Sequence, residues 1–354
     1  MNGGRRYLHR VRPSETSLSL LDLLATTYPH SPRSVWEDHL AHGRVLLNGA
    51  AASAASRLRA ADELTYLRPP WREPAAPTRL PILHADAHLL ALRKPSGLPV
   101  LPSELYYERT VLSLLAAAPP PHYAPVHRLG VATSGVLLAA ASAAAKARLA
   151  AAFEARRVRK TYRALASGRI AADSLRVDAP IGSVPHASWG GSVAAAAPHG
   201  KPALSLVTVL ARREAATLVE VEIPTGRPHQ IRIHLAYAGH PLVGDPLYAA
   251  GGVPRGAEGG ERPPLPRDGG YLLHALRVEL EHPVSGERMT LYAAPPAELC
   301  VEGEAPFVEG EGEEVGGWRR EGGEGGAEGG EGAGEGGEGG QGGWDEGEEA
   351  VALR

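Results

Sequence analysis

Hydrophobic and polar positions alternate along several stretches of the second half of the chain. Residues 276–280 place Leu or Val at every second position and Arg or Glu between them, and this period of two predicts half-buried strands. The turn sequence 283–286 leads into a second run at 289–292, which predicts a hairpin. Residues 162–166 and 218–223 alternate in the same way. Strands that follow one another with few helices predict an α+β body with a mixed, mainly antiparallel sheet.

Helical spacing prevails nearer the N-terminus. The spacing of Leu18, Leu20, Leu21 and Leu24 predicts a short helix. A second helix is expected from about Ser34 to Gly43, since glycine favours the left-handed helix end. Residues 44–49 then read as a strand entering an Asn-Gly turn. Farther along, Ser142 is placed to cap a helix that continues to about Arg157.

Composition divides the chain more sharply than hydropathy does. Four prolines lie within residues 68–79, and proline does not fit inside helices or central strands, so a linker is expected there. Residues 171–203 and 249–270 read as loop-like insertions. The expected organisation is a basic flexible N-terminus at 1–15, a small α+β module at 16–68, a linker at 69–79, the main body at 80–300 and a disordered Gly/Glu-rich acidic tail at 301–354.

Charge is distributed unevenly between body and tail. The net charge is −3, but residues 301–354 hold 16 acidic and 3 basic side chains, which leaves residues 1–300 about +10. A basic body with an acidic tail is typical of nucleic-acid binders, although an enzyme with a mildly basic surface has the same pattern. The tail either competes with RNA for the basic surface or is simply solvated.

Several classes of protein are disfavoured. Cys300 is the single cysteine, and His229 and His234 are five positions apart rather than the four that place two ligands on one helical face. We therefore expect no metal and no other cofactor. No apolar run approaches the roughly 20 residues that span a bilayer. The prediction is a soluble, intracellular protein without a membrane partner, its compartment left open because the N-terminus is Arg-rich and free of acidic residues.

The segment Thr225–Leu235 has the features of a functional turn. A strand ends at Ile223, a glycine turn follows, and Ile231 and Leu235 then mark a short helix. Such a turn presents Arg227 at a helix N-terminus, where an anion site and a structural polar corner are equally compatible with the residues.

The segment 127–138 reads His-Arg-Leu-Gly-Val-Ala-Thr-Ser-Gly-Val-Leu-Leu and resembles the active-site motif H-R-L-D-x-x-T-S-G-x-L-L of RluA-type pseudouridine synthases. Gly130 stands where that motif has its nucleophilic aspartate. Further matches follow the order of the family's motifs: K-P-x-G-x-P-V at 94–100, K-x-Y-x-A-L at 160–165, T-G-R-x-H-Q-I-R-x-H-L at 225–235, G-H-P-I-x-G-D at 239–245 and L-H-A at 273–275. Residues 16–68 are similar to the S4 RNA-binding module that many of these enzymes carry.

The resemblance implies a pseudouridine synthase catalytic fold and a reaction that detaches uracil from C1′ of a flipped uridine and rejoins it through C5. It implies that Arg128 fills the vacated stack, that Tyr162 packs on the uracil and is a proton acceptor at C5, and that Arg227 pairs with the nucleophile. Further residues are expected to contact RNA: His127, Arg33, Arg44, Lys160, His229 and Arg232. The implied partner is rRNA or tRNA, bound by a monomer.

Glycine at position 130 leaves two functions open. The chain is either a synthase that isomerises uridine without the usual carboxylate, or a catalytically silent RNA-binding relative. Arg227 would then need another carboxylate or an RNA phosphate, because an unpaired buried charge is costly. Asp245 is the candidate that the motifs supply, and we expect it to be structural.

Overall fold

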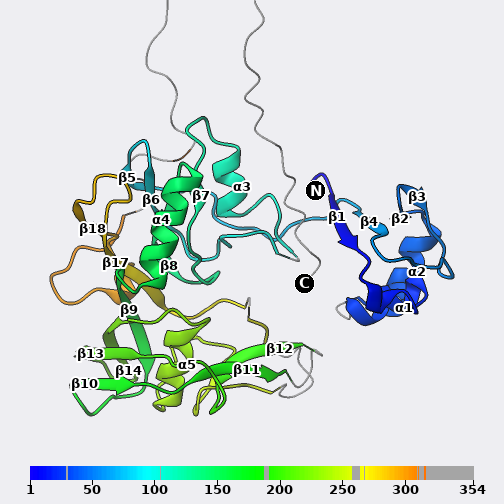
Figure 1. Cartoon of the computed structure of the whole chain (residues 1–354). Helices are drawn as coiled ribbons and strands as arrows, with labels where there is room; N and C mark the ends of the chain where they lie inside the picture. The colour runs from blue at the N-terminus through cyan, green and yellow to red at the C-terminus, as the bar shows by residue number, and fades with distance from the viewer. Residues whose placement is uncertain are drawn as a thin grey trace, which may run out of the picture. The chain divides into compact units, whose positions relative to one another are not determined.

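The computed structural model describes residues 1–28, 31–103, 105–186, 191–256, 264–266, 268–308, 310 and 315. The chain forms two compact units, one made of Met1–Arg72 and the other beginning at Glu73 (Figure 1). Residues 316–354, most of the expected acidic tail, lie outside the described residues, so their disorder stays a prediction.

The first unit combines two helices with a small antiparallel sheet whose strand order is β1-β4-β2-β3. Its elements are β1 (Arg5–Arg10), the 3-10 turn η1 (Pro13–Glu15), α1 (Leu20–Thr27), α2 (Arg33–Ala41), β2 (Val45–Leu47), β3 (Ala50–Ala51) and β4 (Glu63–Arg68). The two helices and the strand with its turn match the sequence expectation. Asn48 and Gly49 both have positive φ, as a tight Asn-Gly hairpin turn requires.

The N-terminal residues differ from the expectation of a flexible segment, which is wrong for residues 5–10. These residues form β1 and pair antiparallel with β4. The ring of Tyr7 stacks on that of Tyr66 with centroids 6.0 Å apart. Charge density alone did not reveal this strand, because a half-buried edge strand tolerates arginine on its solvent face.

The second unit is built on a large sheet with the strand order β10-β13-β14-β9-β17-β8-β6-β5; β18 pairs with β17, and β7 with β8. The bounds are β5 (Ile82–Ala85), β6 (Leu89–Lys94), β7 (Ala124–Pro125), β8 (Ser134–Ala140), β9 (Arg159–Ser167), β10 (Ser174–Val177), β13 (Ser205–Arg212), β14 (Ala216–Glu222), β17 (Leu273–Glu281) and β18 (Arg288–Tyr292). Among the described pairings of this sheet only β17 with β8 is parallel. The predicted α+β class with a mainly antiparallel sheet is confirmed.

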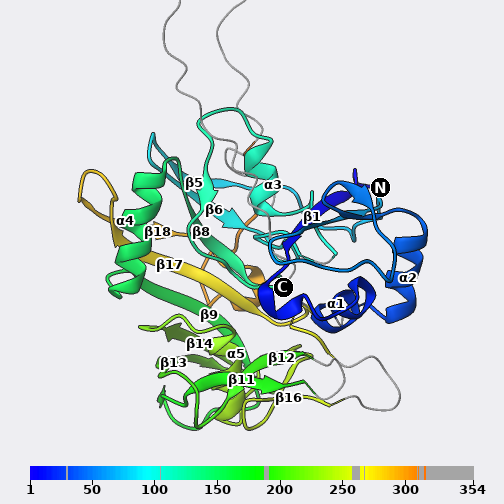
Figure 2. The same cartoon turned by 45° about the vertical axis from the view of Figure 1, so that its right-hand side comes forward.

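Three helices accompany the sheet: α3 (Val111–Ala116), α4 (Ala143–Glu154) and α5 (Gln230–Tyr237); the 3-10 turn η2 spans Ala297–Leu299. The predicted cap of α4 is confirmed, since Ser142 Oγ accepts a hydrogen bond from the Ala145 amide at 3.1 Å. In Figure 2 α4 lies beside β8, whereas α5 lies with β13 and β14 at the other end of the unit. No described helix has the length and apolar character needed to cross a membrane.

The two segments expected to be loop-like contain strands. Residues 171–203 include β10, β11 (Ile181–Pro185) and β12 (Ser192–Ala196), and residues 249–270 include β16 (Val253–Pro254), which pairs with β15 (Tyr248–Ala249). Buried residues of β11, β12 and α5 form one apolar cluster. These strands are stabilised by packing on α5, a tertiary contact that their Gly- and Ala-rich sequences do not signal. Residues 257–263 lie outside the described part.

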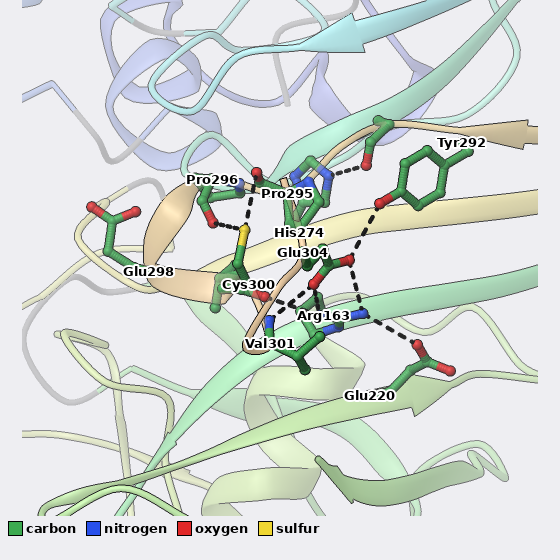
Figure 3. A network of polar contacts seen from close by, with 12 residues as sticks. Arg163, Glu220, His274, Tyr292, Pro295, Pro296, Glu298, Cys300, Val301 and Glu304 are labelled. Atoms are coloured by element: carbon green, nitrogen blue, oxygen red, sulfur yellow. Dashed lines mark hydrogen bonds and ion pairs between the residues drawn. The ribbon is translucent and has the colours of Figure 1, made fainter. Parts of the chain in front are cut away.

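The boundary expected at residue 301 is also wrong, because the chain beyond it still packs on the body. Arg163, on the central strand β9, donates to Glu304 Oε2 at 2.7 Å and to the Leu299 carbonyl at 3.1 Å (Figure 3). The guanidinium of Arg93 lies 3.3 Å from the ring centroid of Phe307. A buried arginine needs a carboxylate partner, so the acidic residue Glu304 belongs to the folded body.

Candidate functional site

A buried lysine donates a hydrogen bond to the loop that contains Gly130. Lys94 is fully buried, and its Nζ donates to the carbonyls of Pro95, Leu98 and Val131 at 2.8, 2.6 and 3.1 Å. Burial lowers the pKa of Lys94 to about 7, whereas three carbonyl acceptors favour its ammonium form. The turn at 94–100 therefore fixes the backbone next to Gly130.

The same loop continues into β8, which lies beside β17. Gly135 has φ 107°, and its Cα faces the backbone of Ala275 so closely that a side chain would collide with it. Ser134 Oγ lies 2.8 Å from His274 Nδ1, and His274 Nε2 donates to the Ala293 carbonyl at 2.9 Å. Residues 127–138 and 273–275, distant in the sequence, thus meet where these two strands of one sheet pair.

Gly130 lies against a tyrosine that the sequence motifs did not indicate. A Cβ built on Gly130 would overlap the hydroxyl oxygen of Tyr271 and would lie 3.2 Å from Thr133 Oγ1 and 3.7 Å from Tyr271 Cζ. The Tyr271 side chain is buried, and its hydroxyl is 3.4 Å from Thr133 Oγ1. The place of a side chain at position 130 is therefore occupied by a phenol hydroxyl.

A buried ion pair lies on the other side of Tyr271. Arg232 Nε and Nη2 donate to Asp245 Oδ2 and Oδ1, both at 2.7 Å, and both side chains are almost completely buried. The Arg232 guanidinium lies 4.1 Å from the ring centroid of Tyr271. Its Nη1 is buried without a hydrogen-bond partner among the described residues. Both oxygens of Asp245 are occupied, which agrees with its expected structural role.

Tyr162 lies in the middle of β9, between β14 and β17. Its register partners are Val221 on one side and Ala275 on the other. Burial raises the pKa of Tyr162 to about 12, so its phenol is neutral at physiological pH. Since Ala275 is also the partner of Gly135, the strand pairing places Tyr162 two strands from the start of β8.

Arg227 takes a different place from the one expected. Its Nε donates to the Pro202 carbonyl at 3.1 Å, and its backbone N–H donates to Gln230 Oε1 at 3.0 Å. Among the described ion pairs none joins Arg227 to a carboxylate. The arginine that contacts Tyr271 beside Gly130 is Arg232, which was predicted to contact RNA and is buried instead.

The motifs at 127–138 and 225–235 lie close enough for the charge of Arg128 to lower the pKa of His229. Arg128 is exposed on the loop, whereas His229 Nδ1 lies 2.8 Å from the Tyr248 hydroxyl, which itself donates to the Ala194 carbonyl. Burial, together with the charges of Arg232 and Arg128, lowers the pKa of His229 to about 3. His229 is therefore neutral, and Arg128 is the cation available at the surface.

His127 and Lys160 lie together near Phe153. His127 Nε2 accepts the Leu138 amide at 3.0 Å, and its ring is 5.1 Å from that of Phe153. Lys160 Nζ lies 5.9 Å from the same Phe153 ring. Burial and the Lys160 charge lower the pKa of His127 to about 4. His127 thus ties the start of the loop to β8 as a neutral acceptor.

Arg33 and Arg44 belong to the first unit and are described within it. Arg33 Nη1 pairs with Asp22 Oδ1 at 2.6 Å, and Arg44 Nη1 pairs with Asp38 Oδ2 at 3.2 Å. Largely exposed pairs of this kind contribute little to stability and can be exchanged for phosphate contacts. Their role in RNA binding stays a prediction.

Two residues of the site were missed by the sequence analysis. Lys94 stands in a recognised motif, but nothing in the motif shows that its ammonium binds the Gly130 loop. Tyr271 precedes the 273–275 motif and has no pattern of its own. Within the described residues, no group of three His, Cys, Asp or Glu side chains is arranged to hold a metal ion.

The sequence of this chain is similar to known proteins of one family. Residues 88–237 match the family model described as RNA pseudouridylate synthase. The chain is 39% identical over 344 residues to RNA pseudouridine synthase 5 of Arabidopsis thaliana, covering 83% of this chain and 93% of the relative. It is 41% identical over 281 residues to an uncharacterized RNA pseudouridine synthase of Synechocystis, covering 79% and 95%. It is 33% identical over 306 residues to ribosomal large subunit pseudouridine synthase D of Yersinia pestis, covering 82% and 91%.

Proposed function

Because this chain belongs to the RNA pseudouridine synthase family, we propose that it isomerises a specific uridine of ribosomal RNA to pseudouridine. The family implies RNA as the substrate, and the similarity to an enzyme named for the large ribosomal subunit favours rRNA over tRNA. In this reaction the N1–C1′ bond breaks, the uracil turns within the site and a C5–C1′ bond forms. C5 then releases its proton and N1 gains one, so the product is an isomer of uridine.

The observation that carries the proposal is the pairing of β8, β17 and β9. Ala275 pairs with Gly135, at the start of the strand that follows the Gly130 loop, and with Tyr162 on its other side, although the three segments lie far apart in the sequence. This pairing supports a common site. Arg128 is the exposed cation beside the loop. It is suited to fill the stack that a flipped nucleotide leaves, because a guanidinium both stacks and contacts phosphate. Tyr162, with its neutral ring, is suited to pack on the uracil.

A second function is favoured by one observation, the absence of a carboxylate at position 130. Asp245 does not replace it, since both of its oxygens are bound to Arg232. A chain with this site that binds and flips uridine without isomerising it would be an RNA-binding protein. The two functions share the substrate and differ in turnover.

Release of tritium from labelled RNA distinguishes a pseudouridine synthase from an RNA-binding protein without turnover. Full-length protein is incubated with large-subunit rRNA and with a tRNA panel, both transcribed with 5-³H-uridine. The synthase releases tritium from the rRNA, and a Tyr162→Leu variant, which removes the ring that packs on the uracil, lowers the rate at least tenfold. Tyr237→Phe, which removes an exposed hydroxyl outside the site, leaves the rate unchanged. Tight binding with no release from any transcript would support the silent RNA-binding protein.

We further propose that residues 16–68 act as an S4-like RNA-binding module. Arg33 and Arg44 are cations at the surface of that unit, and removing a cation that neutralises a phosphate makes binding less dependent on salt. An Arg33→Glu/Arg44→Glu variant should bind the rRNA transcript more weakly and with a shallower salt slope. Equal affinity and slope would remove these residues from the interface.

A further inference from the structure

The hydroxyl oxygen of Tyr271 is the main obstacle to a side chain at position 130. Gly130 is not among the glycines with positive φ, so its backbone accepts an ordinary L residue. The contact that a Cβ would make with the Tyr271 hydroxyl oxygen is too short to persist, whereas the next neighbours lie at 3.2 and 3.7 Å. Without that oxygen the position would hold a Cβ, provided that Thr133 gives way slightly.

Tyr271 is held where it is from two sides. Its ring lies against the Arg232 guanidinium, which Asp245 fixes with two hydrogen bonds. The preceding Gly270 has φ 110°, and a Cβ on it would be only 2.9 Å from the Gly244 carbonyl oxygen. The backbone at Gly270 therefore packs directly on the backbone at Gly244, the residue before Asp245. The phenol cannot move away from Gly130 without disturbing this packing.

The hydroxyl at this place has unused hydrogen-bonding capacity. Its described partner is Thr133 Oγ1 at 3.4 Å, well beyond the usual O–H···O distance of about 2.7–2.8 Å. A phenol can donate one hydrogen bond and accept another. The polar group beside Gly130 therefore has capacity for a partner that the described residues do not supply.

We propose that the Tyr271 hydroxyl contacts the flipped uridine of the RNA substrate in the place where the family motif has its carboxylate, and that Gly130 and Tyr271 form a matched pair. Glycine is required at position 130 because the phenol occupies the volume of its side chain. The group facing the nucleotide is then a phenol hydroxyl instead of a carboxylate. This proposal rests on the proposed function for its substrate, but its steric part does not.

Tyr271→Phe tests the contact with the nucleotide. It removes the hydroxyl and keeps the ring on Arg232, so the fold should be retained. The loss of one hydrogen bond of about 1 kcal/mol corresponds to roughly a fivefold weakening. We expect tritium release from 5-³H-uridine rRNA, or the affinity for that transcript if the wild type releases none, to fall at least fivefold. Tyr237→Phe is the control and should leave both unchanged. Unaltered release and affinity in Tyr271→Phe would overturn the contact.

Thermal unfolding of two single variants and their double variant tests the matched pair. Gly130→Asp alone should lower the melting temperature, because its Cβ overlaps the phenol oxygen. In Gly130→Asp/Tyr271→Phe the aspartate fits, so the loss should be largely recovered. If the two substitutions simply add, the pairing is wrong. A tolerated Gly130→Asp would overturn it as well.

The two experiments fail independently. If the wild-type protein releases no tritium from rRNA or tRNA, the proposed isomerisation fails, while the affinity of Tyr271→Phe and the melting temperatures still judge the matched pair. If the double variant releases tritium faster than the wild type, the aspartate has regained the place that the phenol holds, as the proposal requires. Faster release by Gly130→Asp alone would show that the place was vacant.

Discussion

At the scale of single residues, the site is defined by the buried side chains that contact one another around Tyr271. Tyr271 lies against Gly130, Arg232 packs on the Tyr271 ring, and Asp245 pairs with Arg232. Position 227 was expected to supply the arginine because it stands in the turn. That turn precedes α5 and leaves Arg227 on the Pro202 carbonyl, whereas Arg232 lies within α5 on a face that is buried. The helix, and not the turn, therefore directs an arginine inward.

Removing one charge of the buried pair should destabilise the protein strongly. Asp245→Asn leaves the Arg232 guanidinium buried without its counter-ion, and we expect a loss of about 3–5 kcal/mol in the free energy of unfolding. Urea denaturation measures it. The control is Asp173→Asn: Asp173 pairs with Arg212 at 2.6 Å but is 91% exposed, so its loss should be below about 1 kcal/mol. Equal losses in both variants would contradict the importance of burial.

Acid should destabilise the site through its buried histidines. Burial lowers the pKa of His127 and of His274 to about 4, whereas the unfolded chain binds the proton near pH ~6.5. Above that pH both states are neutral and no penalty exists. As pH falls from about 6.5 towards 4 the unfolded state alone gains protons, so each histidine costs about 1.4 kcal/mol per pH unit.

Unfolding by urea at several pH values between neutral and mildly acidic measures this slope. His127→Gln keeps an acceptor for the Leu138 amide and removes the titrating ring, so its slope should be shallower than that of the wild type. Tyr237→Phe, which removes an exposed hydroxyl, is the control and should leave the slope unchanged. A slope in His127→Gln as steep as in the wild type would assign the acid sensitivity to other groups.

At the scale of elements, local signals predicted the strands with clear alternation and the capped helices, but not the strands stabilised by tertiary packing. The hairpin β17–β18 and helix α4 lie where the pattern placed them. The strands β11 and β12 do not follow from their own residues, which are Gly, Ala and Ser more often than Val or Ile. They exist because they pair with each other and pack on α5.

The cap of α4 offers a test at this scale. Ser142→Ala removes the acceptor for the Ala145 amide, and an N-cap change of this kind costs about 1 kcal/mol. Ser142→Asp retains an acceptor and should be nearly neutral. Thermal unfolding distinguishes the two variants, and an Ala variant as stable as the Asp variant would show that the cap contributes nothing.

At the scale of the whole molecule, the folded body extends beyond the residue at which composition changes. The acidic composition begins near residue 301, yet Glu304 neutralises Arg163, and the Val315 amide donates to the Leu80 carbonyl at 3.1 Å. The glutamates that follow residue 301 therefore include both a half-buried partner of the buried Arg163 and the beginning of the Gly/Glu repeat. Composition alone does not separate them.

Two truncations locate the end of the folded body. Deleting residues 316–354 removes Gly/Glu-rich sequence and should leave the melting temperature unchanged. Deleting residues 301–354 also removes Glu304 and Phe307, which leaves Arg163 without its carboxylate, and should lower it by several degrees. The shorter deletion is also the suitable variant for asking whether the tail competes with RNA: a higher RNA affinity means competition, and an unchanged affinity and salt slope mean a solvated tail.

The sequence by itself determined the family, the α+β class, the order of the motifs and the position of the missing carboxylate. These are local properties, because alternation, turn residues and motif letters are read along the chain. Tertiary structure alone decided which arginine packs on Tyr271 and which group fills the space at Gly130. Tyr271 and Gly130 lie far apart in the sequence, and only the pairing of β17 with β8 and the packing of Gly270 on Gly244 bring them together.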